Sequence, residues 1–282
     1  MNRRTVLRNS VLGIAGLSMP NLLFGSENID SINFTKISNK VPSHYPGLDP
    51  EIVGEVVGKS HSNLERVKEL VDRRPELARA VWEWRFGDFE SAIGAASHVG
   101  RRDIAMYLIS KGARPSIFTF AMLGNYEVVK SIIQLNPGIQ KTMGPHGISL
   151  LDHAYTGQRM KSKMTQKEFD NVKRTIDYLE ALGDADGKKY DKMSEEEQKK
   201  YLGDYKYGSG EKEGFTIAVN MQKRISLAPI GGFGGSLYKV GENKFIYNGA
   251  PSVNISFEVT NKKIKSMTIK EPDLTITAKK VS

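Results

Sequence analysis

A short pattern recurs in the middle of this 282-residue chain. Gly100 and Gly124 each stand just before a segment with helical spacing of its apolar residues, and Ser62 has the same place in an earlier segment. Gly157 marks the same point in a further unit, in which an insertion separates it from the helical segment. One such unit cannot bury its own apolar face, so several units must stack to form a core. The recurring segments occupy residues 63–71, 101–113, 125–133 and 172–182.

The residues that follow these markers resemble the ankyrin repeat, whose pattern is G-x-x-[DE]-V-V-x-x-L-L-x-x-G-A. The segment from Gly100 to Ala113 agrees at nearly every position, and the segment after Gly124 repeats the signature. Chance rarely produces this frame twice with helical periodicity. The resemblance covers residues 52–187 and implies an ankyrin-like α-solenoid of about four helix pairs over residues 51–187.

The spacing of the markers departs from a regular array. Gly124 and Gly157 are 33 residues apart, which is the ankyrin period. Gly100 and Gly124 are only 24 residues apart, so residues 114–116 must turn directly from one helix pair into the next. Residues 80–88 form an enlarged finger in the long first gap, and residues 158–171 are an insertion in the fourth unit.

The first 25 residues have the composition of a bacterial signal peptide. A basic opening with Arg3, Arg4 and Arg8 precedes an apolar stretch from Val11 to Phe24, which is too short to span a membrane. The paired arginines resemble the twin-arginine export motif, and Sec export remains an alternative. We therefore expect a periplasmic or secreted protein with no membrane span in the mature chain. Residues 26–50 and 188–200 read as polar linkers.

Residues 201–282 change to the pattern of an antiparallel β domain. The stretch from Val253 to Val259 alternates apolar and polar residues, which indicates one buried and one exposed face. Short strands with turn signals and no intervening helices predict a meander, closed or nearly closed into a barrel. The region resembles the small β domains appended to penicillin-binding-like hydrolases. The expected strands are residues 214–221, 225–228, 237–240, 245–247, 253–259, 264–269 and 274–278.

The fold class expected from these patterns is α+β as separate domains, with the α-solenoid followed by the antiparallel β-barrel or meander. The chain has no cysteine, which excludes disulfides, thiolate metal sites and a cysteine nucleophile. Its net charge is +9, but the basic residues are spread over helix surfaces and a linker. No basic cluster is interleaved with aromatic residues, so we expect no nucleic-acid partner.

Catalytic motifs are not apparent. Ser236 and Lys239 match S-x-x-K, but on a strand residues three apart point to opposite faces. The glycine-rich residues 231–235 precede a strand, so no helix N-terminus would face a phosphate there. We therefore expect no catalytic residue and no cofactor.

The histidines also show no metal-binding pattern in the sequence. None of the five forms an i, i+4 pair or a metal-spaced set with acidic residues, so we expect no metal site. In stacked units, however, His98 near the end of a first helix and His146 at a finger tip can line one groove.

The predicted function is non-catalytic protein binding in the bacterial envelope, through the groove of the array. Trp and Arg concentrate binding energy at interfaces, and both tryptophans lie in the enlarged finger. The oligomeric state and the identity of the protein partner are not evident. A small-ligand-binding β domain and an unrecognised hydrolase are the alternatives. The residues expected to contact the partner are Trp82, Trp84, Arg85, His98, Arg101, Phe118, Met122 and His146.

Overall fold

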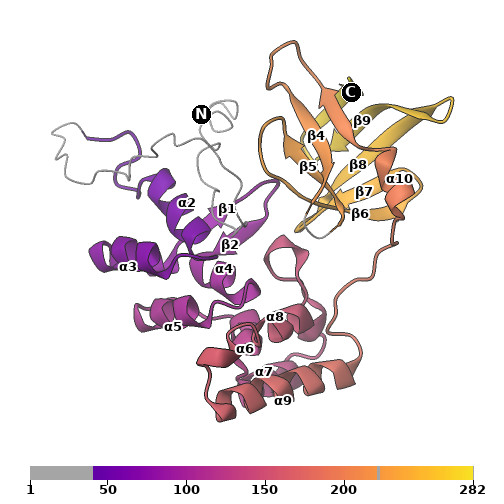
Figure 1. Ribbon diagram of the computed structural model, residues 1–282. Helices are drawn as coiled ribbons and strands as arrows, with labels where there is room; N and C mark the ends of the chain where they lie inside the picture. Colours follow the sequence, from indigo (N-terminus) through magenta and orange to yellow (C-terminus); the bar gives the residue numbers. More distant parts are fainter. Residues whose placement is uncertain (1–40, 221–222, 282) are drawn as a thin grey trace.

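The computed structural model describes residues 41–220 and 223–281. The expected signal peptide and most of the first linker lie outside these residues. Two parts follow each other along the chain: a helical region from Pro50 to Leu182 and a β-barrel from Gly203 to Lys280 (Figure 1). No helix within the described ranges is long and apolar enough to cross a membrane.

The helical region consists of four helix pairs joined by short connections. Side chains at the N-termini fix several helix starts: Asn63, Ser91 and Ser149 each accept a backbone N–H of the first turn. Thr165 and Glu168 form a reciprocal capping box that starts the last helix. The elements are α2 (Pro50–Lys59), α3 (Leu64–Arg73), η2 (Pro75–Arg79), β1 (Val81–Glu83), β2 (Phe89–Ser91), α4 (Ala92–His98), α5 (Arg102–Ser110), α6 (Ile117–Leu123), α7 (Tyr126–Leu135), η3 (Ile139–Lys141), η4 (Pro145–Gly147), α8 (Leu150–Thr156), η5 (Lys161–Lys163) and α9 (Gln166–Leu182).

The predicted ankyrin-like solenoid is wrong as a description of this region. Among the described residues only the first connection between helix pairs carries a β-hairpin, β1–β2, and α5 joins α6 without one. The first helices also do not contact only their neighbours, because α4 contacts α8 as well as α6. The unequal spacing of the glycines explains the difference: a 24-residue interval has no room for a finger, and the insertion before α9 lengthens that helix to 17 residues.

Two apolar clusters hold the helices together. One lies among α2 to α5 and includes Val67, Leu70 and Leu108, all almost fully buried. The other lies among α6 to α9 and includes Leu150 and Leu179. Each cluster takes its residues from several helices, which is why the short helices are stable only when packed together.

The C-terminal part is a closed antiparallel barrel of eight strands, in the order β10-β3-β4-β5-β6-β7-β8-β9. The predicted alternation is present in β8, where Val253, Ile255 and Phe257 are buried between exposed neighbours. The sequence pattern missed β3, the short strand that pairs with both β4 and β10 and closes the barrel. Helix α10 (Glu195–Lys199) precedes the strands, which are β3 (Gly203–Lys206), β4 (Gly214–Val219), β5 (Ile225–Pro229), β6 (Gly235–Gly241), β7 (Lys244–Tyr247), β8 (Ala250–Thr260), β9 (Lys263–Lys270) and β10 (Thr275–Lys280).

Side chains occupy the inside of the barrel. The rings of Tyr201, Phe245 and Phe257 pack edge to face, with centroids 4.8–5.6 Å apart. A hollow of about 440 Å³ lies between β3 and β10, but its lining residues, such as Tyr207 and Thr277, are exposed at the outer surface. The filled interior therefore gives no support to the alternative that the barrel encloses a small ligand.

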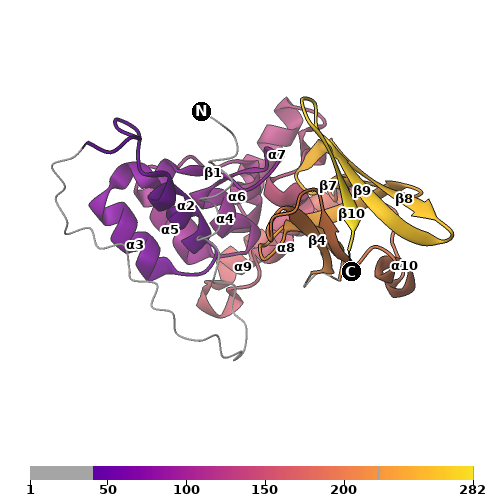
Figure 2. The ribbon, with the colours of Figure 1, turned by 90° about the horizontal axis from the view of Figure 1, so that it is seen from above.

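The β1–β2 hairpin, the η4 segment and the segment that connects the two parts all contact the barrel. The β1–β2 hairpin and the η4 segment lie on the side of the helical region that faces the barrel (Figures 1 and 2). The hairpin tip places the ring of Phe86 4.7 Å from that of Tyr247 at the end of β7. In the connecting segment, Tyr190 stacks on Tyr238 of β6 at 4.5 Å.

Candidate metal site

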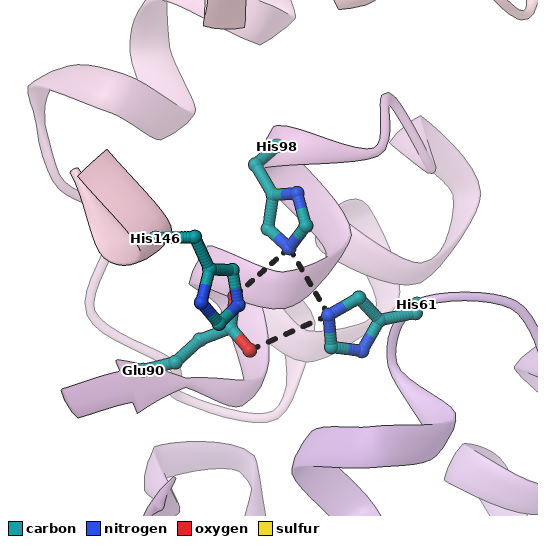
Figure 3. Close-up of side chains that lie close together, drawn as sticks. All are labelled: His61, Glu90, His98 and His146. Carbon is teal, nitrogen blue, oxygen red and sulfur yellow. Dashed lines mark hydrogen bonds and ion pairs between the residues drawn. The ribbon is translucent and has the colours of Figure 1, made fainter. Parts of the chain in front are cut away.

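Three histidines and one glutamate from four separate segments meet at one place beside this contact. His61 follows α2, Glu90 is the middle residue of β2, His98 ends α4, and His146 lies in η4. Their side chains point toward one another (Figure 3). Each offers one nitrogen or oxygen atom, and these four atoms all lie within 4.8 Å of one another.

The β1–β2 hairpin explains why Glu90 is buried here. Trp82 and Glu90 are partners in the antiparallel register, and the neighbouring Phe89 is exposed on the opposite face. The Glu90 side chain has no solvent exposure at all. The indole N–H of Trp84 donates to its Oε2 at 2.7 Å, which fixes one carboxylate oxygen and leaves Oε1 directed at the histidines.

Several distances between the candidate ligand atoms are close to those around a bound ion, although the four-atom set extends to 4.8 Å. Nε2 of His98 lies 2.9 Å from Oε1 of Glu90, and Nε2 of His146 lies 3.3 Å from the same atom. Nε2 of His61 is 3.4 Å from Oε2 of Glu90 and 3.0 Å from Nε2 of His98. Ligands bound tetrahedrally with bonds of ~2.0–2.1 Å lie about 3.3 Å apart. The four residues thus surround a space in which a bound cation would draw the ligand atoms closer together.

The Oε1 atom of Glu90 supports this interpretation. It is buried and has no hydrogen-bond partner, although two histidine nitrogens lie within 3.3 Å. Buried carboxylate oxygens normally accept hydrogen bonds, because an unpaired one costs free energy. The two nitrogens pair with the oxygen electrostatically but do not meet the geometry of hydrogen bonds to it, which is the arrangement expected of ligands around a shared ion.

Two of the histidines are oriented by hydrogen bonds at Nδ1, the ring nitrogen that points away from the other candidate ligands. Nδ1 of His61 lies 3.0 Å from the carbonyl oxygen of Gly58, and Nδ1 of His146 lies 2.7 Å from Oδ2 of Asp88. Each partner is an acceptor, so Nδ1 carries the proton and Nε2 presents its lone pair when the ring is neutral. A carboxylate–histidine pair of the Asp88–His146 kind is a common support of metal ligands.

The pKa shifts in the ion-free site show that nearby positive charge stabilises the buried Glu90 carboxylate. Burial disfavours the Glu90 carboxylate, but His146 and His98 outweigh this effect and hold the pKa of Glu90 far below its usual value. Burial lowers the pKa of His146, but the contacts with Asp88 and Glu90 raise it to about 10. Burial, together with His98 and His146, lowers the pKa of His61 despite the opposing effect of Glu90. A proton on His146 therefore supplies the charge that a metal ion would otherwise bring.

Access to the site is partial. The side chains of His61, His98 and His146 are 14%, 10% and 25% exposed, so the ion would enter beside His146. Nitrogen ligands from imidazole suit Zn²⁺, Cu²⁺, Ni²⁺ and Fe²⁺, whereas Mg²⁺ and Ca²⁺ require oxygen. Three imidazoles and one carboxylate thus select a first-row transition metal.

Three of the eight residues predicted to bind a partner belong to this cluster or support it, namely Trp84, His98 and His146. Phe118 is separated from the cluster by the buried His153, and the centroids of these two rings are 4.8 Å apart. The sequence analysis missed His61 and Glu90, because the ligands come from four segments with no metal-like spacing. The sequence contained one signal for the site: His98 and His146 occupy positions that stacked helix pairs bring to the same side of the stack.

The other predicted contact residues do not belong to the cluster, although Trp82 is the cross-strand partner of Glu90. Trp82 packs on Gly54 of α2, Arg85 approaches Gly232 of the barrel, and Arg101 pairs with Asp103 at 2.7 Å. Met122 is fully buried in the helical core. These residues are not brought together into one exposed surface.

Comparisons with known protein families, curated proteins and solved structures find no match to this chain. The protein is therefore characterised by its fold and its site alone. It has a helical region joined to a closed antiparallel barrel, and a cluster of three histidines and one glutamate lies beside the contact between them.

Proposed function

We propose that this protein binds one divalent first-row transition-metal ion, with Zn²⁺ as the reference ion, through His61, Glu90, His98 and His146. The observation that carries the proposal is the convergence of four ligand atoms within 4.8 Å on a buried carboxylate oxygen that has no hydrogen-bond partner. The ion replaces the proton on His146 and neutralises Glu90 in a site from which water is largely excluded.

Four protein ligands complete a tetrahedral shell. Zinc sites that only hold the ion are usually closed in this way, whereas catalytic zinc sites keep a position for water or substrate. The arrangement thus favours ion binding as the function of the site over metal-assisted hydrolysis. This agrees with the non-catalytic role expected from the sequence, which stays a prediction.

Metal titration of the purified full chain tests the proposal. The protein is stripped with a chelator, dialysed and titrated with Zn²⁺ against a chromophoric chelator, and metal content is measured by mass spectrometry. We expect one Zn²⁺ per chain, with His98→Gln weakening binding by a factor of 100 or more. Mg²⁺ should not compete, because it prefers an all-oxygen shell.

His44→Gln is the matched control, because His44 is a histidine of the described region that lies outside the cluster. It should bind Zn²⁺ like the wild type. Absence of bound metal in the wild type, or equal affinity in the His98 and His44 variants, would contradict the proposal.

A further inference from the structure

The barrel touches the candidate metal site from behind. The turn between β7 and β8 contains Asn248 and Gly249, and it lies against the two segments that carry Asp88 and His146. A Cβ atom placed on Gly249 would lie 2.6 Å from Cγ of Asp88. A Cβ atom on Gly147 would lie 2.5 Å from Oδ1 of Asn248. The two surfaces therefore meet closely, with glycine at the contact on both sides.

Asp88 is the residue through which this contact reaches the ligands. Its Oδ1 accepts the backbone N–H of His146 at 3.0 Å, and its Oδ2 lies 2.7 Å from Nδ1 of the same residue. The carboxylate thus fixes both the backbone and the ring of His146. Only 5% of Asp88 is exposed, and the barrel turn covers it. Removing water from around the pair strengthens its hydrogen bonds and limits the positions of the imidazole.

The β7–β8 turn has a second feature that indicates a close contact with the η4 segment. Oδ1 of Asn248 is buried without a hydrogen-bond partner and faces Gly147, the residue after His146. It is one of three such side-chain atoms in the described part of the chain; another is Oε1 of Glu90 itself. The barrel turn thus bears an uncompensated polar atom at the loop that supplies a metal ligand.

We propose that the β7–β8 turn of the barrel is a positioning element of the metal site, and that docking of the barrel raises the affinity of the helical region for the ion. This rests on the proposed metal-binding function. Asn248 and Gly249 act through Asp88 and Gly147 and do not contact the ion. The helical region supplies all four ligands, and the barrel fixes the one that comes from the η4 segment.

The relation is reciprocal. If the docked turn raises the affinity for the ion by some factor, the ion must favour the docked turn by the same factor. Ion binding therefore tightens the contact between barrel and helical region, and the site reports on the arrangement of the two parts.

Gly249→Ala in the full chain tests the proposal, with Gly231→Ala as the matched control. Both glycines are in the barrel and have a left-handed backbone, with φ of +73° and +75°. A Cβ on Gly231 meets nothing within 4 Å, so only the Gly249 variant pushes on Asp88. Loss of an outer-shell support typically lowers metal affinity ~10–100-fold. We expect that loss of Zn²⁺ affinity for Gly249→Ala, and the wild-type value for Gly231→Ala.

Hydrogen exchange of the wild-type protein supplies the second measurement. Amides of residues 247–250 should exchange more slowly when Zn²⁺ is added, whereas amides in β9, away from the contact, should not change. This measurement decides the question if Gly249→Ala fails to fold.

The outcomes separate the two proposals. A wild-type protein that binds no Zn²⁺ refutes the metal site itself. A wild-type protein that binds Zn²⁺, with equal affinities for the two glycine variants and no change in exchange at residues 247–250, leaves the metal site standing and overturns the role of the barrel.

Discussion

Trp84 donates its indole N–H to Oε2 of Glu90 at 2.7 Å. The bond lies within the β1–β2 hairpin and connects the half-buried Trp84, next to the hairpin tip, to the most buried residue of the cluster. A carboxylate without solvent contact needs such donors, because burying an unpaired charge costs several kcal/mol. Trp84 thereby sets which oxygen of Glu90 faces the histidines.

Trp84→Phe should therefore weaken metal binding. The variant keeps the apolar ring but leaves Oε2 of Glu90 without its donor, so the carboxylate is free to rotate. We expect a ~10-fold or larger loss of Zn²⁺ affinity and a loss of about 1–3 kcal/mol in the free energy of unfolding. Trp82→Phe is the control, since the Trp82 ring packs on Gly54 and Trp82 pairs with Glu90 through the backbone of the hairpin, whereas the indole donor to the carboxylate is that of Trp84. Equal affinities in the two variants would remove Trp84 from the site.

Asp88→Asn removes the charge of the carboxylate that supports His146 and one of its two acceptor atoms. The amide oxygen can still accept a hydrogen bond from Nδ1, but the amide nitrogen then faces the backbone N–H of His146, and the negative charge that increases the basicity of the ring is lost. We expect Zn²⁺ to bind ~10–100-fold more weakly, as measured by competition with a chelator. Asp103→Asn removes a half-buried carboxylate that pairs with Arg101 instead, and it should leave the Zn²⁺ affinity unchanged. A similar loss in both variants would indicate a general effect of charge.

Local sequence patterns predict much of the fold. The helical spacing after Gly100 and Gly124 predicts α5 and α7, and the alternation from Val253 to Val259 predicts β8. These features depend on neighbouring residues, so a single sequence shows them. Closure of the barrel was less visible because β3 has only four residues and depends on its pairing with β10.

The site could not be predicted because it depends on contacts between distant segments. His61 and Glu90 carry no local signal: one lies in a turn, and the burial of the other follows from packing of the hairpin against α2 and α4. Trp84 is predicted as a partner contact because Trp concentrates binding energy at interfaces and lies in the enlarged finger. In this protein it points inward, since Glu90 needs its N–H. The prediction of a regular solenoid was wrong for a related reason. The glycine-marked pattern predicts the individual helix pairs, but the number of residues between successive pairs determines how the pairs stack on one another.

Proton competition gives the site a pH dependence with a defined sign. The pKa of His146 is raised from 6.5 to about 10 in the ion-free fold, chiefly because Asp88 and Glu90 overcome the effect of burial. A raised pKa stabilises the fold fully below pH 6.5, and this contribution is lost as the pH rises through about 10. The ion-free protein should therefore lose thermal stability between pH 6.5 and 10, and His146→Gln should flatten this dependence.

Zinc binding should show the opposite trend. Because the ion displaces the proton from His146, its affinity should increase about tenfold per pH unit between pH 6.5 and 8.5. Chelator competition at several pH values measures the slope. An affinity that is constant over this range would show that no proton leaves when the ion binds.

Gly124 tests the packing of α6, which contacts both α9 and the helix α4 that ends at His98. It ends α6 with φ of +73°, and Gly183 ends α9 in the same way with φ of +74°. Alanine at either position pays the left-handed penalty of about 1–2 kcal/mol. Only at Gly124 would the new Cβ collide with another helix, at 2.6 Å from the backbone nitrogen of Val172. We expect Gly124→Ala to lower the free energy of unfolding by a further ~1–3 kcal/mol relative to Gly183→Ala, as measured by urea unfolding followed by circular dichroism. Equal losses would mean that α6 and α9 pack less closely than the structure shows.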